Sequence, residues 1–126
     1  PEELPDWALR EAREWVRLDP FDVLARAESR CGKVVDLRHE DLPADLWGLH
    51  LVRGNRARIL VNCHLPPLWR RFTLFHELFH LLHHRKGEHF WSRTHQPLSR
   101  FEHEADCFAW AAIWPEWSEG DYAHWD

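Results

Sequence analysis

Residues 71–80 read RFTLFHELFH, and residues 76–80 within them form the pattern H-E-x-x-H. Because residues four apart lie on one face of a helix, the imidazoles of His76 and His80 can reach a single ion. Glu77 projects beside them, where a carboxylate can accept a proton from an attacking water molecule. The stretch therefore predicts a helix that carries a metal site.

We expect this helix to span residues 69–84. Its polar side chains share one arc of about 100°, and apolar residues fill the rest of its surface. A helix of this kind is buried on most sides, and buried polar groups must find partners, which a metal ion supplies for several at once. The polar arc consists of Thr73, His76, Glu77, His80, His83 and His84.

A last helix is expected to begin after a Ser99 cap and to stop before Pro115. Glu102 and Asp106 are four residues apart on it and share a face. If this helix packs on the motif helix, Glu102 becomes a third ligand, and zinc keeps a fourth position open for water. Asp106 can hold a ligand imidazole through its other ring nitrogen. Glu104 competes with Glu102 as a ligand, but we expect it in solvent.

Other polar residues are candidates for supporting roles. His83 lies seven residues beyond His76 on the same side of the helix, so it can support a ligand or contact substrate; the alternative is a histidine at the edge of the core. Arg93, His95 and Tyr122 are candidates to stabilise an oxyanion.

The remaining sequence predicts an α+β fold in one domain, 1–126, with a small sheet beside helices and the motif helix at its centre. We expect helices at 6–18 and 20–31 and strands at 33–37, 46–52 and 56–62. The Gly54-Asn55 turn makes the last two strands a hairpin. We expect strand 56–62 at a sheet edge, where a substrate peptide can add as a further strand, and a polar loop over 85–97.

Composition argues against several classes of protein. The net charge of −5 argues against nucleic acid as a direct partner. No run of 18 apolar residues is present to span a membrane. Cys31, Cys63 and Cys107 are odd in number and widely spaced, which disfavours disulfides and cysteine–zinc sites and favours the cytoplasm. We expect most of the nine tryptophans and seven phenylalanines to lie in the core.

The chain over residues 57–115 resembles the ImmA/IrrE family of zinc metallopeptidases. The matching segments are 58–62, 71–80, 101–109 and 113–115. The resemblance implies that His76, His80 and Glu102 hold zinc and that Glu77 is the catalytic base of a zincin-type fold. It also implies a protein substrate of the helix-turn-helix repressor class.

Two other functions fit the same residues. The domain can be a non-proteolytic module that binds a repressor or antitoxin partner and has kept a zinc site. Alternatively, the zinc is purely structural, and a further protein ligand such as His83 or His95 fills the fourth position.

Overall fold

The structure is a computed structural model that describes residues 4–83, 91–94 and 100–118, with only the backbone described at 91–94, 100–102 and 117–118. Four helices and four strands lie within these residues. In chain order they are α1 Asp6–Ala12, α2 Pro20–Cys31, β1 Val34–Glu40, β2 Gly48–Arg53, β3 Arg56–Asn62, α3 Pro67–His83, β4 Trp91–Thr94 and α4 Arg100–Ser118.

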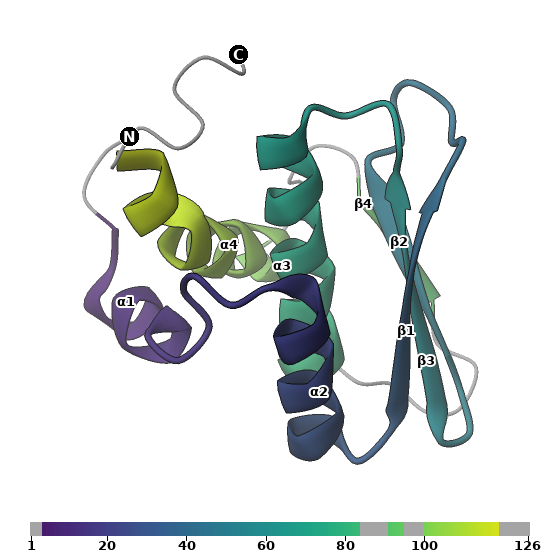
Figure 1. The fold of residues 1–126 in the computed structure, drawn as a ribbon, viewed down its shortest axis with the longest axis horizontal. Coiled ribbons are helices and arrows are strands. Elements are labelled where there is room, and N and C mark those ends of the chain that lie inside the picture. The colour runs from purple at the N-terminus through teal and green to yellow at the C-terminus, as the bar shows by residue number, and fades with distance from the viewer. Residues whose placement is uncertain (1–3, 84–90, 95–99, 119–126) are drawn as a thin grey trace.

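The strands form one mixed sheet in the order β1-β3-β2-β4. β3 pairs parallel with β1 and antiparallel with β2, and β4 adds to β2 in the antiparallel direction. The helices lie together on one side of this sheet (Figure 1). The predicted α+β class is confirmed, but the prediction that strand 56–62 lies at an edge is wrong. The hairpin holds one side of β3 and the parallel strand β1 covers the other, so β3 is central.

Local signals explain the elements before α3. The Asp19 side chain accepts a hydrogen bond from the backbone N–H of Asp22 at 2.9 Å, and Pro20 opens α2. Gly32 ends α2 with φ of 71°, a left-handed conformation that glycine adopts without strain. Gly54, with φ of 59°, makes the turn between β2 and β3. The predicted helix 20–31 and the predicted hairpin are confirmed.

The motif helix α3 stands at the centre of the molecule, as predicted. It packs against α4, β3, β2 and α2. Its apolar and polar faces are both covered, which explains why few of its side chains reach solvent. The buried residues are Leu68 and the continuous run from Phe72 to Leu81.

The first helix, α1, ends at Ala12 and is therefore shorter than the predicted helix 6–18. The backbone N–H of Trp15 bonds to the carbonyl of Ala12 at 2.8 Å in a turn rather than continuing the helix. This turn places the Trp15 ring in the core, with its centroid 6.4 Å from those of Phe75 and Phe108. Burial of a large aromatic ring has overridden the helical spacing.

Two further predictions are wrong near the end of the chain. Residues 91–94 form strand β4, where a loop was expected, because one side of β2 is open for a strand to pair. The rest of the predicted loop 85–97 lies outside the described residues, as does the predicted Ser99 cap. Helix α4 also continues through Pro115 to Ser118. Glu116, the residue after Pro115, is buried, and its carboxylate lies 3.1 Å from the guanidinium of Arg71 on α3. This ion pair holds the helical turn that follows the proline.

Candidate metal centre

Four residues of the polar arc of α3, Thr73, His76, Glu77 and His80, are buried in the helix that packs against the sheet and α4. The exposed fractions of His76, Glu77 and His80 are 1%, 0% and 4%. Ionisable groups are seldom buried in this way unless a partner or a ligand offsets the loss of water. Three such groups within five residues therefore indicate a site built for chemistry rather than for packing.

The two motif histidines are placed as a shared ion requires. Their ring centroids are 5.1 Å apart, and the ring planes are inclined at 65°. Two imidazole nitrogens bound to one zinc ion at ~2.1 Å with a tetrahedral angle hold their ring centroids about 5 Å apart. The spacing of His76 and His80 thus fits a common divalent ion without any movement of α3.

Asp106 of α4 contacts the first of these histidines. Its Oδ1 lies 2.8 Å from Nδ1 of His76. A carboxylate on Nδ1 fixes the ring orientation and favours the tautomer whose Nε2 lone pair is the metal donor. Close packing of the helices makes this contact possible, because Ala105 and Ala109 are fully buried and small.

Glu102 lies in the first turn of α4, one turn before Asp106. Its side chain is outside the described part of the structure, so its role as the third ligand stays a prediction. Among the described residues, no three His, Cys, Asp or Glu side chains are grouped closely enough to hold a metal. The rival Glu104 is half-buried rather than fully in solvent.

His50 of β2 is part of the same cluster, and sequence analysis missed it. It is fully buried, and its Nδ1 lies 2.5 Å from Oε1 of Glu77. Its ring also stacks on that of His80, with centroids 5.8 Å apart and planes 20° from parallel. The second oxygen of Glu77, Oε2, has no hydrogen-bond partner among the described residues and is also buried. One carboxylate oxygen is thus held and the other is left for a ligand or water.

The strand pattern contained a signal for His50. Inward-facing residues alternate along β2, and Gly48, His50 and Val52 are the buried ones. A histidine at an inward position, on a strand expected to pack near the motif helix, is a candidate partner for that helix. The predicted strand 46–52 did not fix which face turned inward, so this signal was not used.

The other site candidates lie elsewhere or outside the described side chains. His83 pairs with Glu11 of α1, and its ring centroid is 4.5 Å from that of Phe79; a role for it in supporting the site stays a prediction. Arg93 lies on β4, where only the backbone is described, and His95 and Tyr122 lie outside the described residues.

Cys107, one residue after Asp106, is not a favourable metal ligand. None of the three cysteines forms a disulfide with another described residue, and Cys31 and Cys107 are buried. Burial, together with the negative charges of Asp106 and Glu104, raises the pKa of the Cys107 thiol. A raised pKa keeps this sulfur protonated at neutral pH, and a protonated thiol is a poor metal ligand.

Comparison with known proteins identifies the family. The model of a peptidase family described as the IrrE N-terminal-like domain matches residues 33–116. The chain belongs to this family. The predicted ImmA/IrrE resemblance is thereby confirmed, and the match spans β1 to α4, including the motif helix, His50 and Asp106.

Membership of this family implies a peptidase-type function and suggests a metal cofactor. No curated protein and no solved structure matches the chain. None of the described helices combines the length and the hydropathy needed to cross a bilayer.

Proposed function

We propose that this chain is a zinc-dependent peptidase that hydrolyses a peptide bond in a protein of the helix-turn-helix repressor class. The observation that carries the proposal is the buried cluster on α3. His76 and His80 have the spacing of ligands to one ion, and Glu77 lies beside them with one oxygen unpaired among the described residues. Membership of a peptidase family supports the reaction class.

His76, His80 and Glu102 would hold the zinc ion, and Asp106 would orient His76. Bound there, zinc would supply a Lewis acid that polarises the scissile carbonyl and lowers the pKa of a bound water to about 7. Asp106 pre-orients the His76 ring, so this donor would move little when zinc binds.

Glu77 is the proposed general base. His50 holds Oε1 at 2.5 Å, so the carboxylate keeps one orientation. Oε2 then accepts a proton from the attacking water and returns it to the leaving amine. Both transfers need a fixed carboxylate that can reach the water oxygen and the amine nitrogen. Because the pair is buried in a water-poor site, each of these electrostatic interactions is stronger than in bulk solvent.

A substrate strand needs a sheet edge, and β4 is a better candidate than the central β3. β4 ends the described sheet on the side of β2, the strand that carries His50. An extended peptide that added to β4 would be aligned by backbone hydrogen bonds. The repressor class of substrate rests on the family resemblance.

The test is incubation of the chain with purified helix-turn-helix repressors, beginning with any that is encoded beside its gene. Zinc-loaded protein is expected to produce fragments that mass spectrometry can map, and EDTA should abolish them. Glu77→Gln should bind zinc normally yet lose activity by about 10² to 10⁴-fold. Glu40→Gln, the same change at an exposed position on β1, is the matched control and should cut as the wild type does.

Two results would count against the proposal. A Glu77→Gln variant that still cuts removes this carboxylate from the mechanism. A stable, zinc-containing complex with the repressor and no fragments favours the non-proteolytic binding module.

A further inference from the structure

The face of the sheet that points away from the helices is uncovered in the described part of the molecule. The helices all lie on the opposite side (Figure 1), and side chains alternate along each strand, so half of them point outward. The outer basic face is defined by seven of these outward residues on β1, β2 and β3: Val34, Asp36, Arg38, Leu51, Arg53, Arg56 and Arg58.

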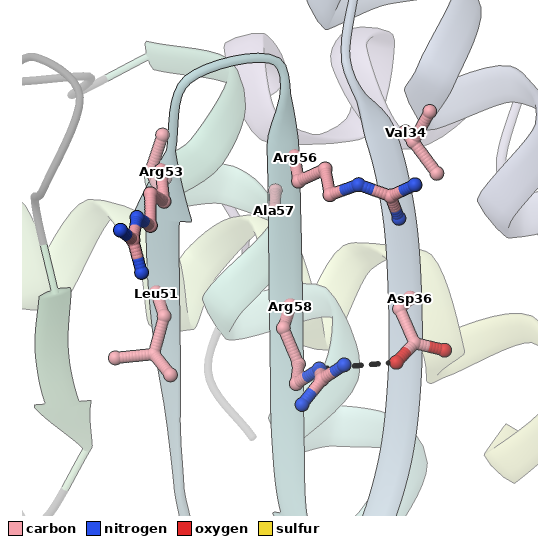
Figure 2. A pocket seen from close by; sticks show the side chains of 8 residues that line it. Val34, Asp36, Leu51, Arg53, Arg56, Ala57 and Arg58 are labelled. Carbon is pink, nitrogen blue, oxygen red and sulfur yellow. Dashed lines mark ion pairs between the residues drawn. The ribbon is translucent and has the colours of Figure 1, made fainter.

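Positive charge collects on this face although the chain as a whole carries −5. Four of its seven residues are arginines, and Asp36 is its one acid; a second acid, Glu40, lies at the far end of β1. Asp36 is already engaged, because its Oδ2 lies 3.1 Å from Nε of both Arg38 and Arg58. Figure 2 shows the Asp36–Arg58 pair.

Arg53 and Arg56 remain at the hairpin end of the face. Both are exposed, and neither makes an ion pair with another described residue. They extend from neighbouring strands, where they are register partners across β2 and β3 (Figure 2). Their side chains diverge in Figure 2, Arg56 toward β1 and Arg53 away from it, so each guanidinium group can pair with a separate carboxylate in a two-point contact.

Apolar side chains lie between the charges. Val34 and Leu51 are 45% and 39% exposed, which makes them two of the four large hydrophobic residues exposed in the described chain. A hollow of about 450 Å³ runs across the face, and Val34, Leu51, Arg53, Arg56 and Arg58 are among its lining residues (Figure 2). Ligand sites usually measure about 300–1,000 Å³, so the hollow can accept a short segment of chain.

We propose that the outer basic face binds an acidic segment of a partner protein, with aliphatic side chains between its carboxylates. The carboxylates pair with Arg53 and Arg56, and the aliphatic groups cover Val34 and Leu51. Nucleic acid is a poorer occupant, since it needs many phosphate contacts and the net charge of −5 repels a long polyanion.

This binding is separate from the metal centre. Neighbouring residues of β2 point to opposite sides of the sheet, so His50 faces α3 while Leu51 faces outward. A segment on the outer face therefore contacts neither Glu77 nor the motif histidines. The proposal does not depend on peptidase activity, and its test can fail while that of the peptidase succeeds.

The experiment measures fluorescence anisotropy of a labelled peptide of alternating aspartate and leucine added to the full chain. The wild type should bind it, and binding should weaken as salt rises. The double variant Arg53→Ser/Arg56→Ser should lose about tenfold or more in affinity. The double variant Arg10→Ser/Arg13→Ser, which removes two exposed arginines from the region of α1, should bind as the wild type does.

Four outcomes would overturn the proposal. The first is an equal loss of peptide affinity in both double variants. The second is a lysine–leucine peptide that binds the wild type as tightly as the aspartate–leucine peptide does. The third is tighter binding of an oligothymidylate, which would favour nucleic acid. The fourth is a chain that does not bind the peptide but self-associates, with the self-association abolished by Arg53→Ser/Arg56→Ser. That result would assign the face to a second copy of the chain. Circular dichroism of each variant checks that it is folded.

Discussion

Gly48 sets the distance between strand β2 and the motif helix, and replacing it with alanine should separate them. A Cβ at this position would lie 2.6 Å from Cγ2 of Thr73 and 2.8 Å from the backbone oxygen of Leu60. Both distances are shorter than real Cβ contacts allow. Glu77 is also close, with its Cγ 3.8 Å from the same point, so any shift of β2 reaches the proposed catalytic base.

Neither neighbour can move freely. The Thr73 hydroxyl donates a hydrogen bond to the carbonyl of Trp69 at 2.7 Å, and the side chain is fully buried. The Leu60 oxygen belongs to the strand that pairs with β2. Overpacking of a filled core costs about 1–3 kcal/mol, and two immobile contacts place Gly48→Ala near the upper end of that range. The melting temperature should fall by roughly 10 °C for a domain of this size.

Thermal and urea unfolding followed by circular dichroism measure the effect, and a second substitution tests its cause. Thr73→Ser removes Cγ2 and keeps the hydroxyl, so it should recover about 1 kcal/mol when combined with Gly48→Ala. Gly54→Ala is the control: nothing lies within 4 Å of its Cβ, and its cost comes from φ of 59° alone. Thr73→Ser should not rescue it. A Gly48→Ala melting point within 2 °C of the wild type (a margin of roughly 0.5 kcal/mol), or strict additivity with Thr73→Ser, would refute this reasoning.

Two further predictions concern the metal centre. In the presence of EDTA, His50→Leu should lower the free energy of unfolding by about 2–3 kcal/mol, because it leaves the buried Glu77 carboxylate without its donor. His50→Asn, which keeps a donor near the position of Nδ1, should cost less, and adding Glu77→Leu to His50→Leu should recover stability; an additive double variant would contradict the pairing. Asp106→Asn should weaken zinc binding by about 10- to 100-fold through its contact with His76, as measured by competition with a chromophoric chelator. Unchanged affinity would show that this contact does not support the ligand.

Elements with strong local signals could be predicted from the sequence. Helix α2 has its cap at Asp19 and its left-handed glycine at Gly32, and the hairpin has Gly54 in its turn. These signals act within a few residues, where the chain's own conformational preferences decide the outcome. The family resemblance was predictable for the same reason, because the motif and the later acidic segment are each contiguous.

The wrong predictions all involve contacts between distant segments. The position of β3 depends on its parallel partner β1, and strand order is not encoded in either strand alone. The early end of α1 depends on Trp15 finding Phe75 and Phe108. The continuation of α4 depends on Arg71, 45 residues before the Glu116 that it holds. Tertiary contacts override local propensity at each of these points.

The candidate site also contains some features that local sequence determines and others that depend on contacts between distant segments. The spacing of His76 and His80 follows from helix geometry, so their position on one face of α3 was predictable. His50 enters only when the register of β2 and the packing of β2 on α3 are known. The alternation of Gly48, His50 and Val52 contained that information, but which face turned inward depended on the rest of the fold.

The pairing of α1 with α4 has a consequence for synthesis on the ribosome. α1 leaves the ribosome before α4, and α4 is the described element that α1 chiefly contacts. Asp106 is also on α4, so a nascent chain that already displays the whole motif still lacks the aspartate that orients His76. A chain released by a stop codon before residue 100 therefore lacks both the His76–Asp106 contact and the packing of α1 on α4, and it should be poorly folded.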